Sequence, residues 1–199
     1  QRQQPVPHAH APPRPTPHRR VAVPSPPHPH PFHDDLDATL RLEEERRTSS
    51  IVETARLLAE AVRHGLRTIA FCRSRKLTEL VTSYTREILV ASEAAHLCSA
   101  VGVYRGGYAP EDRRVLESAL RTGHLLGVAA TNALELGIDV VGLDCTLHLG
   151  FQGSVASMWQ QAGRAGRGGQ DSVAIYVAFS GPLCQYFMHE PSALLAREV

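Results

Sequence analysis

Two arginines near the carboxyl end of the sequence have the type and spacing that phosphate chemistry requires. Arg164 and Arg167 stand three residues apart in the run 160–167, QQAGRAGR, where small neighbours leave both guanidinium groups unshielded. Residues three apart share one face of a helical turn, and a guanidinium is a planar, permanent cation that binds phosphate oxygens in pairs. The run predicts two arginines that reach across an interface to a polyphosphate.

A second run lies upstream of these arginines. Residues 130–139 read ATNALELGID and begin thirty residues before Gln160. Taken together, the two runs resemble motifs V and VI of superfamily 2 helicases. Their sequences are most similar to those of the RecQ-like subfamily of plants and fungi and of the related bacterial mitomycin-repair helicases.

The resemblance implies a role in nucleotide hydrolysis for five residues of these runs. Arg167 is expected to be the arginine finger, with Arg164 as its partner on the phosphates and Gln160 coupling the site to a facing domain. Gly137 lets the backbone approach closely, and Asp139 lies near the ribose hydroxyls. A guanidinium placed where γ-phosphate charge develops stabilises the transition state. The alternative is a surface pair of arginines at a helix end, with Asp139 as a helix cap.

A second group of residues is expected to hold the nucleic-acid backbone. Arg73, Ser74 and Arg75 resemble motif IV, whose loop grips phosphates of the tracked strand. Arginine with a hydroxyl suits phosphate, which positions a strand without reading its bases. The resemblance adds Thr131 and Asn132, and Arg105 in a flexible Arg-Gly-Gly run is a further candidate. Arg73, Ser74 and Arg75, considered singly, are equally well surface residues.

Alternating strands and helices must position these groups. Short β-prone runs at 68–72, 101–104, 125–130, 145–149 and 173–178 predict strands. Helices are expected from a capping box at Ser50 to near Gly65, over 76–90, from Pro110, and over 154–163. Such alternation predicts βαβ units, hence an α/β fold: a RecA-like, open, mainly parallel sheet with helices on both faces.

The candidate motifs gather at one place in that fold. The runs at 72–75, 105–108, 131–132 and 150–154 each follow a predicted strand. Ligands of open parallel sheets collect at the carboxyl ends of the strands, so we expect these loops to share one edge. If the protein is part of a helicase motor, the guanidinium groups of Arg164 and Arg167 must be accessible and must face the same way as these loops.

Composition divides the chain into three parts. Residues 1–33 hold eleven of the 14 prolines and six of the 11 histidines, and no acidic residue precedes Asp34. This leader is expected to be disordered, because it offers too little apolar surface to offset its chain entropy. Residues 34–50 form a charged linker, and 51–199 the folded domain. The net charge is +1, which argues neither for nor against the binding of nucleic acid.

The local distribution of charge favours phosphate binding at one edge of the domain. Six basic residues occur with no acid between Glu60 and Glu79: Arg63, His64, Arg67, Arg73, Arg75 and Lys76. A solvated face is an equally simple explanation of this run.

Other polar residues favour structural roles. Cys72, Cys98, Cys145 and Cys184 show no metal-ligand spacing, so ordinary thiols in a reducing, intracellular compartment are expected. No membrane-spanning run is visible. His148 is expected to be a satisfied core histidine and Trp159 a packing residue, and no metal site is expected in this domain.

The motifs that match belong to one of two motor lobes. No GxxxxGK[ST] run and no DExH run occur, and both belong to the first RecA-like lobe of such helicases. Gln152 also replaces the proline of the family's GFPGS loop. The resemblance implies the carboxyl-terminal lobe of an ATP-dependent 3′–5′ DNA helicase that serves DNA repair. Its partners would be DNA and the first lobe, with Mg²⁺ ligands on that lobe, and its location the nucleus of a eukaryote or the cytoplasm of a bacterium.

Two alternatives stay open at this point. A truncated, non-enzymatic module could grip nucleic acid or a partner through Arg73, Arg75 and Arg105. An RNA helicase would carry similar motifs V and VI. For the chain alone, ATP hydrolysis is not expected, because it lacks the P-loop, the base and the metal ligand.

Overall fold

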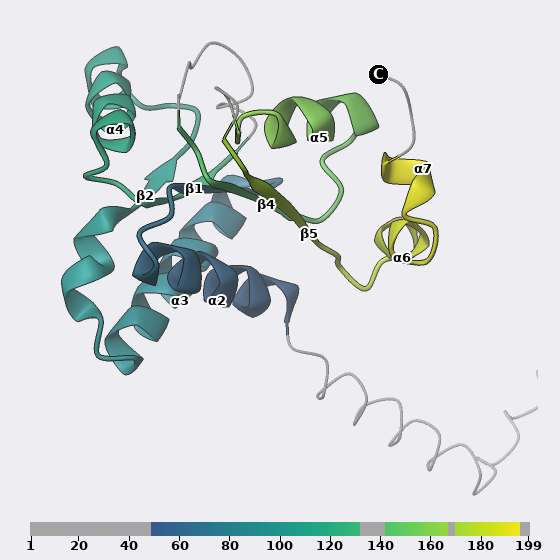
Figure 1. Ribbon diagram of the computed structural model, residues 1–199, viewed down its shortest axis with the longest axis horizontal. Helices are drawn as coiled ribbons and strands as arrows, with labels where there is room; N and C mark the ends of the chain where they lie inside the picture. The colour runs from purple at the N-terminus through teal and green to yellow at the C-terminus, as the bar shows by residue number, and fades with distance from the viewer. Residues whose placement is uncertain (1–48, 132–141, 167–169, 196–199) are drawn as a thin grey trace, which may run out of the picture. The chain divides into compact units, whose positions relative to one another are not determined.

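The computed structural model describes residues 49–131, 142–166 and 170–195, and Figure 1 shows the arrangement of their elements. The strands are β1 (Thr68–Phe71), β2 (Val101–Tyr104), β3 (Gly127–Ala130), β4 (Cys145–Leu149) and β5 (Val173–Val177). The helices are α2 (Ser50–Arg63), α3 (Arg75–Ala91), α4 (Pro110–Thr122), α5 (Val155–Ala162), α6 (Pro182–His189) and α7 (Ser192–Leu195), with a 3₁₀ helix, η1 (Ala95–Ala100).

The five strands form one sheet in the order β2-β3-β1-β4-β5. Every pairing between them is parallel, and β1 lies in the middle with Phe71 beside Ala130 on one side and His148 on the other. The predicted parallel α/β sheet is therefore confirmed. A parallel sheet places all strand ends of one kind at one edge, and this property positions the loops discussed below.

Helices cover both faces of this sheet (Figure 1). Helices α2 and α3 pack on one face, against Ala70 and Cys72 of β1 among others. Helix α4 packs on the opposite face, where the core contains Ile69 and Phe71 of the same strand. Helix α5 lies beside β4 on that second face. Alternate residues of β1 therefore enter different cores, as expected for a strand buried on both sides.

Close approach of α2 to the sheet depends on a glycine. A side-chain carbon at Gly127 would lie 2.7 Å from Cγ2 of Val62 and 3.2 Å from Cδ1 of Leu58. The first contact is shorter than real side-chain carbon atoms show and the second is tight, so glycine lets the helix pack at this depth without a shift of Val62.

The outer strand β2 is partly covered by a side chain from α3. Nη2 of Arg86 donates a hydrogen bond of 2.7 Å to the carbonyl oxygen of Val101, the first residue of that strand. The edge of the sheet thus has one of its acceptors occupied from within the domain.

The capping box predicted at Ser50 is wrong. Ser50 is the first residue of α2, and Ser49 precedes it as the N-cap without a side-chain hydrogen bond. The hydroxyl of Ser50 donates instead to the carbonyl oxygen of Ala178, at 2.6 Å. A long-range contact with the chain after β5 therefore replaces the local cap, a partner that sequence spacing cannot reveal.

Three elements were not predicted: η1, α6 and α7. Helices α6 and α7 form a small apolar cluster with α5, built on Met158, Phe187 and Leu194. The indole of Trp159 donates 3.0 Å to the carbonyl oxygen of Leu194 while 37% of the residue stays exposed. Trp159 thus ties α5 to α7 at the rim of the cluster. The predicted core role is wrong in that respect.

Candidate functional site

The carboxyl edge of the sheet carries the loops expected to hold nucleic acid. Arg73 and Ser74 follow β1, Arg105 follows β2, Thr131 follows β3, and the loop 150–154 follows β4. Because the strands are all parallel, these loops share one edge, as predicted. Asn132 lies outside the described residues.

Ser74 has a structural task at this edge. Its hydroxyl is the N-cap of α3 and accepts a 3.3 Å hydrogen bond from the backbone N–H of Leu77. The side chains on either side of it, Arg73 and Arg75, are both exposed. The cap fixes the start of the helix and with it the backbone from which the two arginines project into solvent.

Contacts with the neighbouring loop order Arg75 and Arg105. A side-chain carbon at Gly107, whose φ is 104°, would lie 3.7 Å from Nη2 of Arg75, so this guanidinium rests against the glycine turn after β2. Nε of Arg105 lies 3.1 Å from a carboxylate oxygen of Glu79, and its Cζ is 5.6 Å from the ring centre of Tyr108. Two loops that are distant in the sequence thus present their arginines together.

Thr131 continues the sheet by one residue. Its backbone N–H donates to the carbonyl oxygen of Tyr104, at 3.1 Å, and its side chain is partly buried. Thr131 therefore stands at the boundary between the end of β3 and the segment 132–141, which is outside the described residues. Gly137 and Asp139 of the predicted nucleotide site fall in that segment.

The described part of the predicted nucleotide site lies at the end of α5. Ser154 caps this helix by accepting 3.0 Å from the N–H of Ser157, and the helix ends at Ala162 with Gly163 as its C-cap. Arg164 follows in a turn and is partly buried, whereas Gln160 is exposed. Arg167 is outside the described residues. The helix stops before either arginine, so the expectation that both lie on one helical turn is wrong.

Arg164 also does not share the edge of the strand-following loops. Helix α5 starts beside the carboxyl end of β4 and runs back, so that Ala165 forms a parallel bridge with Leu143, just before β4 begins. The N–H of Gly166 donates to the carbonyl oxygen of the same Leu143, at 3.1 Å. The run 160–166 therefore converges with the last residues of the 130–143 stretch, at the opposite end of β4. The expectation of one common edge is wrong for Arg164, so the motor interpretation cannot rest on that condition and has to be carried by other observations.

A buried polar pair fastens α5 to β4. Nδ1 of His148 lies 3.4 Å from Oε1 of Gln161, and Nε2 lies 3.1 Å from the hydroxyl of Thr146. All three residues are at most 1% exposed. Burial lowers the pKa of His148 to about 4, although the hydrogen bond with Gln161 opposes the shift. The predicted core histidine is confirmed. Sequence reasoning missed Gln161, which only the three-dimensional pairing reveals.

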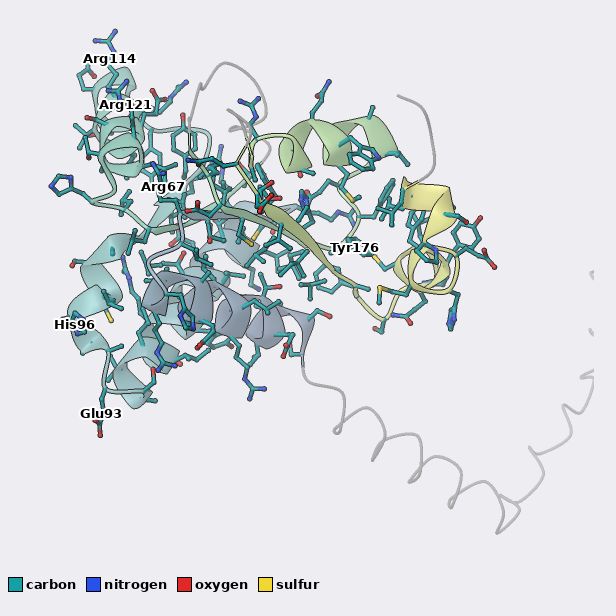
Figure 2. All side chains as sticks on the ribbon, in the orientation of Figure 1. Arg67, Glu93, His96, Arg114, Arg121 and Tyr176 are labelled. Carbon is teal, nitrogen blue, oxygen red and sulfur yellow. The ribbon has the colours of Figure 1, made fainter. Side chains whose placement is uncertain are left out.

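The basic run between Glu60 and Glu79 does not form one edge, and that expectation is wrong. Strand β1 divides it. Arg63 is the last residue of α2 and His64 is its C-cap, and both pair with Glu60, at 2.9 Å. Arg67 stands at the amino end of β1, where its Nε lies 3.9 Å from a carboxylate oxygen of Asp144, and Figure 2 shows it well apart from Tyr176 of β5. Arg73, Arg75 and Lys76 alone reach the carboxyl edge.

Gln152 fills the place where the resemblance expects proline. It is 6% exposed, and its amide nitrogen donates to the carbonyl oxygens of Phe71, at 3.1 Å, and Leu149, at 3.3 Å. These are the last residues of β1 and β4. Two hydrogen bonds that proline cannot make thus hold the loop against the sheet, and the glutamine is accommodated without opening this edge.

A five-stranded parallel sheet with helices on both faces and exposed arginines on the loops at its carboxyl edge defines a RecA-like lobe. Residues 51–169 match the family of the helicase conserved C-terminal domain, and the chain belongs to this family. The match ends at the glycines that follow Arg167 and includes both the run 130–139 and the run 160–167.

Relatives and a solved structure agree with this assignment. The chain is 42% identical over 152 residues to the ATP-dependent helicase HRQ1 of Saccharomyces cerevisiae, covering 76% of the chain and 14% of the relative. It is 44% identical over 151 residues to the ATP-dependent helicase YprA of Bacillus subtilis, covering 76% and 20%. The helicase MrfA, solved in complex with DNA and AMPPNP, superimposes with a TM-score of 0.70 at 44% identity, covering 76% of this chain and 21% of that one.

The chain therefore spans about a fifth or less of the length of these relatives, and it corresponds to their carboxyl-terminal helicase domain. Among the described residues, no helix is long and apolar enough to cross a membrane. The same residues contain no cluster of three or more histidines, cysteines or carboxylates arranged to hold a metal ion.

Proposed function

We propose that this domain is the carboxyl-terminal motor lobe of an ATP-dependent 3′–5′ DNA helicase that serves DNA repair. The observation that carries the proposal is the gathering of Arg73, Ser74, Arg75, Arg105 and Thr131 at one edge of a parallel sheet. The similarity to helicases named as ATP-dependent, and to MrfA bound to DNA and AMPPNP, supports it.

In this proposal the carboxyl edge follows the phosphates of one DNA strand. Arg105 is already held by Glu79, so little of its side-chain freedom is lost when phosphate binds, and Arg75 lies exposed next to the loop that carries Arg105. Thr131, which follows β3 between β2 and β1, and Asn132 are assigned to the same strand of DNA. Contacts of this kind are independent of base sequence, which suits a motor that must pass over any sequence.

The nucleotide contacts are assigned to the other end of the sheet, where α5 ends. ATP with Mg²⁺ would bind between this lobe and a first RecA-like lobe, and that first lobe would supply the metal ligands. The described part fits a triphosphate in chemical terms, because Arg164 offers a fixed cation and the exposed Gln160 offers an amide toward a facing surface. Arg167 is assigned the finger, and Gly137 with Asp139 the ribose side. ATP supplies the free energy that separates and rejoins the lobes.

We further propose that residues 1–33 are a disordered leader, 34–50 a charged linker and 51–199 the helicase domain. The eleven prolines of the leader and its lack of acidic residues support this division. In a eukaryotic cell the protein would act in the nucleus.

Two measurements on the chain test the proposal. The purified chain is expected to bind short single-stranded DNA, with affinity that falls steeply as salt rises, and to show no magnesium-dependent ATP turnover. Turnover by the chain alone would overturn the division of labour between two lobes. Stronger binding to RNA than to DNA of the same sequence would favour an RNA helicase, and failure to bind either would favour a module that recognises another partner.

A further inference from the structure

A pocket opens at the carboxyl edge beside Arg73. It has a volume of about 420 Å³ and lies between the loops that follow β1, β4 and β5 and the start of α6. Its principal lining residues are Arg73, Phe151, Gly153, Phe179, Leu183 and Cys184. This volume falls within the range of pockets that take a small organic group.

Two aromatic side chains form fixed walls of this pocket. A side-chain carbon at Gly150, whose φ is 72°, would lie 2.5 Å from Cδ2 of Phe179, so this ring is seated directly on the glycine backbone. The ring of Phe151 is 4.8 Å from that of Phe187, centre to centre, at an angle of 34°. Both residues are only partly buried. The rings are therefore held by packing and still reach the pocket, as a stacking surface requires.

The electrostatics of the pocket favour a negative group. Arg73 is exposed, and none of the described residues that line the pocket is a carboxylate. Burial opposes ionisation of the Cys184 thiol. The Tyr176 hydroxyl, backbone groups of Phe151 and Phe179, and the charge of Arg73 nevertheless combine to lower its pKa. Arg73 is the charged side chain of this lining, so an anion is favoured beside its guanidinium.

We infer that this pocket binds one nucleotide of single-stranded DNA, with its base against Phe151 and Phe179 and its phosphate at Arg73. The inference rests on the proposed function, because it extends the strand contacts of Ser74 and Arg75 by one further position along the same edge. An aromatic wall beside a cation matches a nucleotide, which carries a flat base and a phosphate a few bonds apart. The contact is tolerant of base identity, since every base has a stacking face.

Helix α6 offers a matched pair of variants to test the inference. Leu183 and Met188 are each 53% exposed, and only Leu183 lines the pocket. Leu183→Asp would place a negative charge in the pocket, and an acid in the first turn of a helix does not weaken the helix. Fluorescence anisotropy with labelled oligothymidine should show about five- to tenfold weaker binding for Leu183→Asp, and a change below about twofold for Met188→Asp. Circular dichroism should show both variants folded.

A second arm separates base from phosphate. An oligonucleotide with abasic sites keeps its phosphates and loses its stacking groups, so the unaltered chain should bind it about fivefold more weakly than oligothymidine. The penalty of Leu183→Asp should shrink on the abasic strand. Equal affinity for the two strands would overturn the inference, and so would a Leu183→Asp variant that binds like Met188→Asp.

The inference and the proposed function fail in different ways. If Arg75→Ala and Arg105→Ala weaken binding while Leu183→Asp does not, the pocket assignment is wrong and the strand-binding edge stands. If the unaltered chain binds no single-stranded DNA, both are wrong. Tighter binding of oligouridine than of oligothymidine would overturn the choice of DNA as the occupant.

Discussion

The two ends of the sheet differ in the elements that carry their candidate residues. At the carboxyl edge, Ser74 caps α3, Arg105 is held by Glu79, and the exposed Arg75 is the first residue of α3. At the other end, Arg164 follows α5 in a turn that the N–H of Gly166 ties to the carbonyl oxygen of Leu143. The first region is built on loops that follow parallel strands, and the second on the end of a helix.

The proposed function assigns different work to these two regions. Strand contacts need a rigid platform that one domain can build alone, because phosphate is recognised by charge and position. A hydrolytic site that must open and close in every cycle is better shared between two surfaces, neither of which is complete by itself. The predictions below test this division, beginning with the largest expected effect.

The sharpest test of the α5 end is Arg167→Ala in a complete helicase that contains this lobe. If Arg167 is the finger, kcat for ATP hydrolysis should fall by about 10³–10⁵, because the cation acts on charge that develops in the transition state. Nucleotide affinity should change far less. Arg121→Ala, an exposed arginine on α4, should leave both unchanged. Equal loss of affinity and turnover in Arg167→Ala would refute the assignment.

The buried contact between His148 of β4 and Gln161 of α5 can be weakened by lowering the pH. His148 has a pKa of about 4 in the folded chain against 6.5 for an ordinary histidine. The unfolded chain therefore takes up a proton between these values while the folded chain does not. Stability that is fully present above pH 6.5 should fall by up to about 3 kcal/mol as the pH drops toward 4, as measured by urea denaturation.

His148→Gln should flatten this part of the pH profile. A profile for His148→Gln that is as steep as that of the unaltered chain would show that other groups cause the loss.

The sheet that carries both regions can be tested with two neighbouring glycines. Gly127→Ala places a carbon 2.7 Å from Cγ2 of Val62 and should lower the free energy of unfolding by about 1–3 kcal/mol. Gly102 lies on the adjacent strand, and its nearest neighbour would be Leu125 at 3.4 Å. Gly102→Ala should therefore change stability by less than about 0.5 kcal/mol. Equal costs in thermal or urea denaturation would contradict the packing of α2 described above.

The smallest expected effect concerns the carboxyl edge. Arg75→Ala should weaken binding of single-stranded DNA about fivefold and reduce the slope of log affinity against log salt by about one. Arg63→Ala should alter neither quantity, because Arg63 is paired with Glu60 at the end of α2, before the amino end of β1. An unchanged slope for Arg75→Ala would remove this arginine from the path of the strand.

The fold was largely predictable from the sequence, because buried parallel strands are short apolar runs between amphipathic helices. The prediction for Cys145–Leu149 agrees with the structure to the residue, and Val101–Tyr104 does as well. The strand predicted over 125–130 starts later, at Gly127, because Leu125 and Leu126 lead into it as connecting residues. Helices α6 and α7 escaped prediction because they are short and depend on packing with α5.

The site was predictable in its residue types and less so in its geometry. Spacing suggested that Arg164 and Arg167 share a helical turn, but Gly163 ends the helix first. The run between Glu60 and Glu79 looked like one basic edge, yet β1 passes through it and sends its halves to opposite ends. The pairs His148 with Gln161 and Ser50 with Ala178 join residues far apart in the chain, which no local pattern reveals.

The hydrogen bond from Arg86 to Val101 has a consequence for how the domain behaves in a crowded solution. An outer strand with vacant acceptors is a template on which a second chain can polymerise. Here a charged side chain occupies the first acceptor and makes the rim of the sheet costly to dehydrate. A second chain that adds to β2 would therefore have to displace this contact.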